Sequence, residues 1–237
     1  GPISGKRDVN DEETYGGRVS LLWDATKDLS FELSYLGQDS NFDGRPVEAN
    51  NVGDYKTDFY VKESLSDNLD LYNLTIKYDM GWGDINASSS YWDRSVAQQG
   101  DRADLTNAIV PGAKLTGAGQ FTEDYQKEIT QELRLSSKSE GSLTWILGVF
   151  YQEKDNGFEQ YITDELNFFV EFVNILGIPA TDARQLLDQS GKFKEEQTAL
   201  FGELNYDITD QWSAMVGLRY FDYEQITTIK NNDINIL

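Results

Sequence analysis

One acidic segment carries half of the residue pattern of a calcium-binding loop. Asp39, Asn41 and Asp43 place oxygen ligands at alternate positions, and Gly44 follows where such a loop must turn sharply. Asn50 stands where a bidentate acid would close the site. The segment therefore predicts a solvated turn that does not hold calcium tightly.

Other chemistries find less support. Gly112 and Gly117 have the spacing of a phosphate-binding loop, but no Lys-Ser/Thr pair follows the second glycine. With 41 Asp+Glu, carboxylate pairs suited to glycoside hydrolysis are expected by chance. The chain has no cysteine and no histidine, which removes thiolate nucleophiles and the commonest zinc ligand. We therefore expect a protein that is not an enzyme and needs no metal or cofactor.

Charge and hydropathy exclude two further classes. The net charge is -21, with 20 Lys+Arg against 41 Asp+Glu, so we expect no binding to nucleic acid. The longest apolar run, Trp145 to Tyr151, is far shorter than the roughly 18 residues that a membrane-spanning helix needs. The mean hydropathy of -0.54 does not exclude a membrane β-barrel, because every second residue of its strands is polar.

Alternating apolar and polar residues indicate paired strands, most clearly from Thr198 to Phe221. Leu200, Leu204, Val216 and Leu218 share one parity, while the other parity carries mostly polar residues. Such a pattern gives a sheet one apolar and one polar face. Four such pairs are expected, at residues 15–23 and 29–37, 73–80 and 85–91, 129–136 and 143–151, and 198–208 and 212–221.

The connections alternate between short and long. Short turns join the two strands of each pair, whereas long polar stretches are expected at about 40–68, 93–126 and 154–195. Aromatic residues recur near the strand ends, as in the interfacial girdles of membrane barrels. They are Trp23, Tyr35, Tyr78, Tyr91, Tyr151, Tyr206, Trp212 and Tyr220. The fold class predicted is all-β: a segment of a large antiparallel transmembrane β-barrel with about eight strands in four hairpins, short periplasmic turns and long extracellular loops.

The third long connection differs from the others because it is rich in phenylalanine. Asp164 to Leu176 has helical apolar spacing, and a second short helix is expected from Thr181 through Leu187. The simplest interpretation of this connection is a loop that packs on itself. The alternatives are a lid that contacts ligand and a contact with a partner protein. For the lid, the expected ligand-binding residues are Tyr161, Phe168, Phe169 and Phe172.

Three segments carry a family resemblance. Thr130 to Ser137, Trp145 to Tyr151 and Ala199 to Tyr220 resemble the barrel of TonB-dependent outer-membrane receptors. The resemblance implies an active transporter in the outer membrane of a Gram-negative bacterium. In such a transporter a plug domain fills the lumen, and an inner-membrane TonB-type protein supplies energy. The ligands of the family include iron chelates, cobalamin and oligosaccharides.

The residue pattern of this sequence shows no coupling box, no plug and no closing strands of that family. We therefore expect residues 1–237 to form part of a receptor barrel, since eight strands cannot make the roughly 22-stranded barrel of such transporters. Outer-membrane lipid and the plug are the expected surroundings. A small eight-stranded barrel is the alternative architecture, and a plug-free porin or a soluble, acidic, glycan-binding β-sandwich are the alternative functions.

The lumen-facing residues follow from the parity of the strands. Glu132, Arg134, Glu203 and Arg219 are expected to point into the lumen. Phe150, Phe201, Met215 and Phe221 share that face. Inward aromatic and charged side chains suit a wall that packs on a polar plug.

Overall fold

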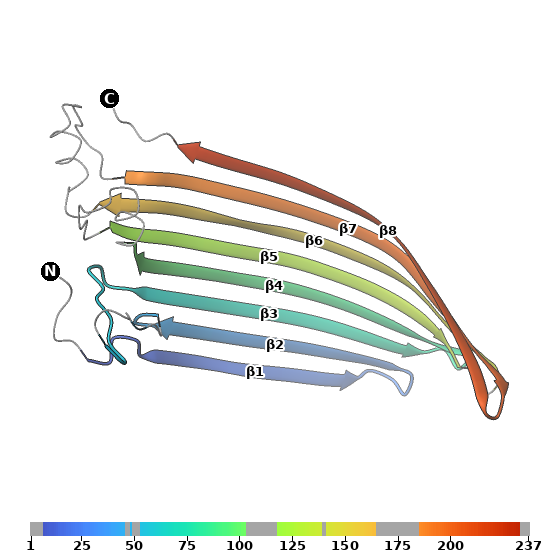
Figure 1. Cartoon of the computed structure of the whole chain (residues 1–237). Coiled ribbons are helices and arrows are strands. Elements are labelled where there is room, and N and C mark those ends of the chain that lie inside the picture. Colours follow the sequence, from blue (N-terminus) through green and yellow to red (C-terminus); the bar gives the residue numbers. More distant parts are fainter. Residues whose placement is uncertain are drawn as a thin grey trace, which may run out of the picture.

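The computed structural model describes residues 7–45, 48, 53–102, 118–138, 141–164 and 185–232, and these form one antiparallel sheet. Each strand pairs with its neighbours in chain order, from β1 to β8 (Figure 1). The strands are β1 (Glu12–Asp24), β2 (Leu29–Phe42), β3 (Ser64–Asp79), β4 (Gly83–Asp101), β5 (Ala118–Ser137), β6 (Leu143–Asp164), β7 (Gln185–Thr209) and β8 (Trp212–Asn232). The eight strands and the single sheet confirm the predicted segment of a large barrel.

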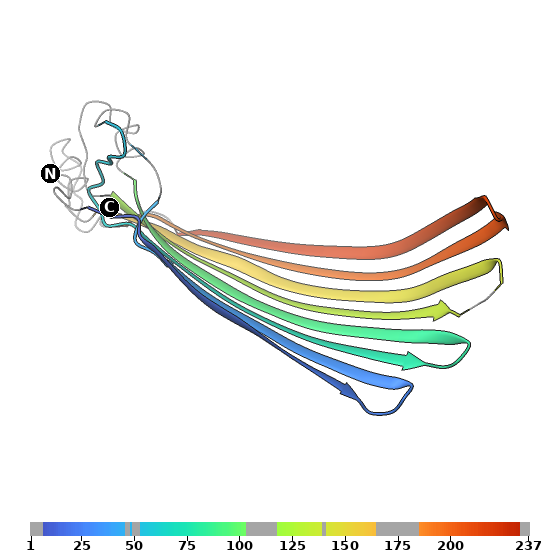
Figure 2. The ribbon, with the colours of Figure 1, turned by 90° about the horizontal axis from the view of Figure 1, so that it is seen from below.

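The sheet is long and curved. Its strands contain 13 to 25 residues and bend together along their length (Figure 2). All four tight connections lie at one end, which we call the turn end, and the opposite end is the loop end (Figure 1). Within the described residues β1 pairs with β2 but not with β8, so the alternative of a closed eight-stranded barrel is wrong.

The strand register places the apolar residues on one face, which we call the outer face. Leu21 lies opposite Leu33, which lies opposite Leu74. The return strand with three consecutive serines keeps this register, because Ile85 lies opposite Tyr78. The opposite, inner face carries the other parity of every strand.

The apolar residues of the outer face are exposed. Leu21, Leu147 and Leu218 are 63%, 53% and 80% exposed, and the buried hydrophobic residues among those described are Val61, Ala118, Ile162 and Ala199. A soluble sandwich would bury such leucines between two sheets, whereas the described strands form one sheet. These leucines belong to an apolar band that crosses the sheet, as on the lipid-facing side of a membrane barrel. Large apolar side chains of the band are exposed on every strand but β4, where they are half-buried.

Aromatic side chains border this band. Toward the loop end, the ring of Tyr35 lies 4.9 Å from that of Tyr72, whose centroid is 6.4 Å from that of Tyr91. Toward the turn end, Trp23 stacks on Phe31 at 5.3 Å. Direct cross-strand pairing brings each of these rings together, because the paired residues point to the same face.

The strands extend well beyond the apolar band, so the predicted limits of the long connections are wrong. β2 continues to Phe42 and β3 begins at Ser64; β4 and β5 reach Asp101 and Ala118, and β6 and β7 reach Asp164 and Gln185. Polar residues dominate both faces of these extensions, and the sequence therefore indicates loops. Neighbouring strands nevertheless satisfy the backbone hydrogen bonds, which makes an apolar face unnecessary.

The predicted helices fall largely outside the described residues. Phe168, Phe169 and Phe172 lie there, together with most of the expected helix from Asp164 to Leu176. The second predicted helix is wrong at its end, because Leu186 and Leu187 belong to β7. Among the residues that the structure describes, no helix has the length and hydropathy to cross a membrane.

Candidate functional site

Two arginines and two phenylalanines gather on the inner face at the level of the apolar band. They come from consecutive strands: Arg134 from β5, Phe150 from β6, Phe201 from β7 and Arg219 from β8. The pairing of Arg134 with Gly148, of Gly148 with Phe201 and of Phe201 with Arg219 aligns them. We call Arg134, Phe150, Phe201 and Arg219 the arginine–phenylalanine cluster.

Gly148 makes room for this cluster. A Cβ atom at this position would collide with the ring of Phe201, which occupies the space above the glycine. The Phe201 ring therefore lies against β6, where both guanidinium groups reach it. The Cζ atoms of Arg134 and Arg219 are 5.8 and 5.9 Å from its centroid. Arg219 also lies 5.1 Å from the Phe150 centroid, within the range of a cation–π interaction.

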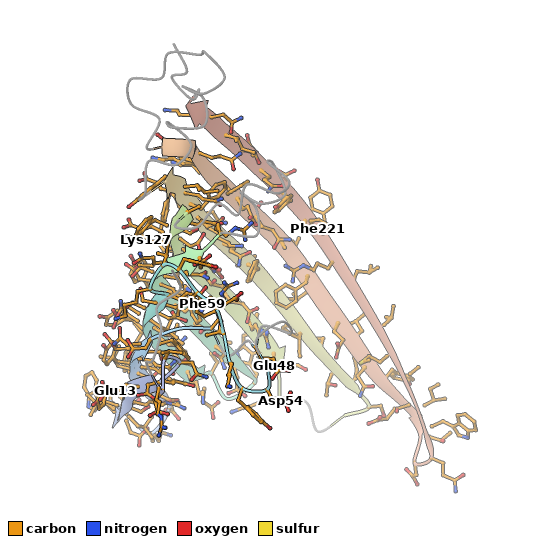
Figure 3. All side chains as sticks on the ribbon, turned by 60° about the vertical axis from the view of Figure 1, so that its left-hand side comes forward. Glu13, Glu48, Asp54, Phe59, Lys127 and Phe221 are labelled. Carbon is orange, nitrogen blue, oxygen red and sulfur yellow. The ribbon has the colours of Figure 1, made fainter. Side chains whose placement is uncertain are left out.

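The two arginines differ in their partners. Arg134 donates from Nε to Glu132, at 2.5 Å, and this carboxylate neutralises it. Arg219 contacts the two rings, and no carboxylate of the described residues forms an ion pair with it. The structure thus brings three of the predicted lumen residues together, while Glu203 lies on the same face, opposite Gly217. Farther along β8, the side chain of Phe221 projects from the sheet and is 55% exposed (Figure 3).

A second group of side chains lies on the inner face near the loop end. Phe158 of β6 faces Gly191 of β7, and its ring fills the space that a Cβ atom of Gly191 would need. Phe193 follows two residues later on the same face, with its ring centroid 6.3 Å from that of Phe158 and the ring planes 28° apart. The two rings thus form one half-buried aromatic surface across β6 and β7.

Amide side chains surround these rings. In the row toward the loop end, Gln160 pairs with Gln189. In the row toward the turn end, Gln126 pairs with Asn156, which lies opposite Phe193. We call these six residues the aromatic–amide patch: Gln126, Asn156, Phe158, Gln160, Gln189 and Phe193.

The cations nearest to the aromatic–amide patch are already paired. Arg94 on β4 donates from Nε and Nη2 to the two carboxylate oxygens of Asp67, at 2.8 and 2.5 Å. This double hydrogen bond holds the pKa of Asp67 below its ordinary value. Lys154 lies 3.6 Å from Glu195. Neither cation is left unneutralised for an anionic ligand.

The predicted ligand residue Tyr161 lies elsewhere. It belongs to β6 and shares the outer face with Phe121, on which it stacks with a centroid separation of 4.9 Å. The sequence pattern around Tyr161 predicts a loop, because the part of β6 beyond the apolar band is rich in polar residues. The ligand role of Tyr161 stays a prediction, and its side chain points away from the aromatic–amide patch.

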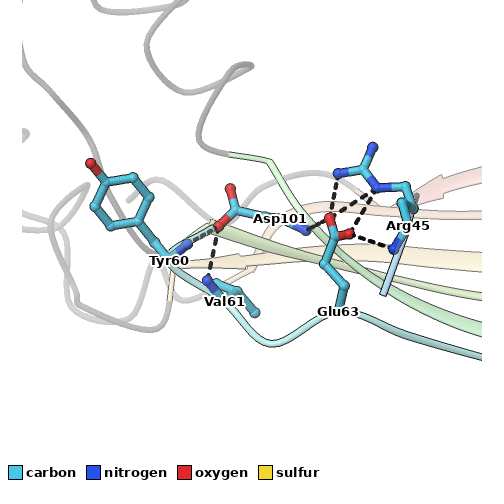
Figure 4. Close-up of polar contacts among 5 residues, drawn as sticks. All are labelled: Arg45, Tyr60, Val61, Glu63 and Asp101. Carbon is cyan, nitrogen blue, oxygen red and sulfur yellow. Dashed lines mark hydrogen bonds and ion pairs between the residues drawn. The ribbon is translucent and has the colours of Figure 1, made fainter. Parts of the chain in front are cut away.

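The sequence also gave no indication of a buried carboxylate pair at the loop end. Glu63 and Asp101 are 3% and 8% exposed. Glu63 accepts hydrogen bonds from the backbone N–H groups of Arg45 and Asp101, each at 3.1 Å, and from the Arg45 guanidinium (Figure 4). Asp101 accepts from the backbone N–H groups of Tyr60 and Val61, at 2.5 and 2.8 Å. We call Arg45, Glu63 and Asp101 the carboxylate clasp.

The clasp fixes a segment that has no strand partner. Residues 57–63 precede β3, and the backbone N–H groups of Tyr60 and Val61 are satisfied by the Asp101 carboxylate instead of a neighbouring strand. In an acidic chain these two residues have no distinctive spacing, because they lie 38 residues apart. Pairing of β3 with β4 brings them together.

The half calcium motif lies mostly in a strand, so the predicted turn is wrong for Asp39 to Phe42. These residues continue β2. Asn41 donates to Asp39 at 2.6 Å, and Asp43 lies 3.5 Å from Lys62. Over the part of the chain that the structure describes, no three acidic side chains are grouped so that they could hold a metal ion.

Comparisons with known proteins agree with this geometry. The sequence matches the family described as TonB dependent receptor-like, beta-barrel, over residues 5–235. Two solved structures share the fold at 13% identity: the ferric yersiniabactin uptake receptor FyuA from Yersinia pestis and the ferric citrate transporter FecA. The TM-scores are 0.77 and 0.62, with 99% and 95% of this chain covered. The chain spans 33% and 31% of those chains, and none of the curated proteins matches it.

The family match covers nearly the whole chain, and the outer and inner faces of the sheet have the chemistry of a barrel wall. The chain therefore belongs to the TonB-dependent receptor-like β-barrel family.

Proposed function

We propose that this chain is part of the wall of an active transporter in the outer membrane of a Gram-negative bacterium. The transporter imports a scarce ligand with energy from a TonB-type protein of the inner membrane. Family membership and the exposed apolar band on the outer face support this proposal. In this interpretation the protein is a transporter and not an enzyme.

The arginine–phenylalanine cluster is the observation that carries the proposal. Its rings, together with the exposed Met215 and Phe221, face the lumen at membrane depth. Apolar surface in contact with water is unfavourable, and Arg219 lacks a carboxylate partner among the described residues. A plug domain that covers this wall and offers an acidic side chain to Arg219 satisfies both requirements.

Family membership suggests the general class of the transported ligand. FyuA is named for ferric yersiniabactin uptake and FecA for ferric citrate transport. An iron chelate, cobalamin or an oligosaccharide is accordingly the ligand that we propose for this transporter.

The plug contact is tested in the full-length receptor with Arg219→Glu and the charge-conserving control Arg219→Lys. We expect Arg219→Glu to raise conductance in planar bilayers and entry of vancomycin into cells, because a repelled plug leaves the lumen partly open. Arg219→Lys stays close to the parent. A parent protein that conducts continuously is a plug-free porin, and the proposal is then wrong.

Energy coupling is tested separately with purified proteins. We expect the periplasmic domain of the TonB-type protein to bind the full-length receptor. No binding in the presence or absence of ligand contradicts the coupling part of the proposal.

A further inference from the structure

We infer that the aromatic–amide patch recognises a neutral, hydroxyl-rich ring compound, an oligosaccharide, in preference to an anionic metal chelate. The inference rests on the proposed transport function, since it names the ligand class for the same lumen. It is drawn from the inner face near the loop end, where a ligand entering the lumen from outside first meets the barrel wall.

The aromatic surface provides a flat platform. Because Gly191 has no side chain, the Phe158 ring lies against β7 instead of standing upright from β6. The ring of Phe193 lies beside it on the inner face, 6.3 Å away, and both side chains are half-buried. The C–H faces of pyranose rings are apolar and stack on such surfaces, where their burial is favourable.

The surrounding side chains match the edges of a sugar. Gln160 and Gln189 form the next row beyond Phe158, toward the loop end, whereas Gln126 and Asn156 share the row of Phe193. An amide carries both a donor and an acceptor group, as a sugar hydroxyl does. Gln126 already donates from Nε2 to Glu128 at 3.3 Å, and the Asn156 Oδ1 atom is buried, so Gln160 and Gln189 are the amides open to a ligand. Gln189 is held in place because its Nε2 atom donates to Asn231 at 2.8 Å.

The charges of this region disfavour an anion. None of the six patch residues is charged. Asp124, which lies opposite Phe158 on the same face, adds a carboxylate. The neighbouring cations Arg94 and Lys154 are already paired with Asp67 and Glu195. A chelate with net negative charge is recognised through unneutralised arginine or lysine side chains. The chain as a whole carries a net charge of -21, which repels anions.

The experiment uses the full-length receptor in detergent and isothermal titration calorimetry. The probes are neutral hexasaccharides of glucose, xylose and N-acetylglucosamine, and ferric citrate is the anionic comparison. We expect at least one hexasaccharide to bind more tightly than ferric citrate, with a Kd that changes less than twofold between 50 mM and 500 mM NaCl, because neutral ligands are insensitive to screening.

Matched variants localise the site. Phe158→Ala is expected to weaken hexasaccharide binding about tenfold, a loss of about 1.4 kcal/mol, because it removes the ring on which the sugar stacks. Gln160→Leu together with Gln189→Leu weakens it by a similar factor. Phe121→Ala, on the outer face of the neighbouring strand β5, leaves binding unchanged. Heat-modifiable migration on gels verifies that every variant is assembled.

Three outcomes overturn the inference: no hexasaccharide binds, binding is equal in Phe158→Ala and Phe121→Ala, or ferric citrate binds more tightly than every hexasaccharide. These results leave the transport proposal standing, because that proposal depends on plug closure and on the TonB-type protein, which are measured without these ligands.

Discussion

The strands differ in outer-face chemistry between the apolar band and the loop end, although the same backbone pairing continues through both regions. At the level of the apolar band, β7 and β8 present Leu200, Leu204 and Leu218 outward, and these side chains are 59%, 48% and 80% exposed. Toward the loop end the same face of the same strands carries Lys194 and Glu224. The outward chemistry therefore changes from apolar to charged within a few residues, while the pairing does not change.

This difference shows that the membrane determines the side chains of the outer face, whereas backbone pairing determines the length of the strands. Lipid requires an apolar outer face, and this requirement ends where the membrane ends. Strand pairing continues farther, because each backbone group still finds its partner in the neighbouring strand. β7 and β8 remain paired from Thr209 and Trp212 to Asp188 and Asn232. The extra length raises the inner wall, with its aromatic–amide patch, above the membrane.

The largest expected effect tests the two faces at membrane depth. In the full-length receptor, Val216→Arg should destabilise the barrel by about 2 to 4 kcal/mol, because a guanidinium on the lipid face is costly near the bilayer midplane. Met215→Arg, on the inner face of the same strand, should cost much less. Urea unfolding in lipid vesicles measures both.

A third variant sharpens this test along the strand. Thr228 lies on the outer face near the loop end, opposite Lys192. Thr228→Arg should therefore change stability by less than about 1 kcal/mol, as lipid-facing charges do near the interface. Equal losses for Val216→Arg and Thr228→Arg would show that the membrane reaches the loop end.

A smaller effect is expected at the carboxylate clasp. Glu63→Gln removes the charge that pairs with Arg45 and leaves one of the bonded donors facing an amide N–H₂. We expect local destabilisation of about 2 kcal/mol and faster trypsin cleavage at Lys56 and Lys62, without loss of barrel assembly. Asp43→Asn, which removes an exposed contact with Lys62 and keeps both cleavage sites, is the control.

Unchanged proteolysis in Glu63→Gln would mean that the clasp does not order the segment before β3. Failure of assembly would mean instead that the clasp belongs to the barrel wall. Either result contradicts the comparison between the two regions. In that comparison, lipid and strand pairing stabilise the strands at the apolar band, whereas side-chain contacts contribute to the stability of the loop end.

The smallest effect is a pH dependence at the loop end. Arg94 lowers the pKa of Asp67 in the folded state, so the pair stabilises the fold above the unfolded value of 3.8. This stabilisation is lost as the pH falls through the lower, folded pKa. Asp67→Asn should cost about 0.5 to 1 kcal/mol at pH 7, and the difference from the parent should vanish at low pH.

Urea unfolding at pH 7 and at pH values below 3.8 tests this prediction. The expected sign is a parent that loses more stability than Asp67→Asn on acidification. A difference that stays constant with pH would show that Asp67 acts through packing and not through its charge.

Sequence patterns were reliable where the apolar band supplied a signal. The alternation of Leu200, Leu204, Val216 and Leu218 predicted the strands and their faces, and Arg134 and Arg219 lie on the face opposite to these side chains. The patterns failed beyond the band. The pattern predicts a long loop at Phe158, although this residue belongs to β6, because polar residues dominate both faces there.

The amino-acid sequence by itself determined the two-faced strands, the family and the absence of thiol and imidazole chemistry. These follow from local periodicity and composition, which each segment carries independently. Only the tertiary structure decided where the strands end and which side chains meet. Glu63 and Asp101, or Phe158 and Gly191, are distant in the chain and become neighbours through strand register. Register depends on pairing between segments, and no single segment encodes it.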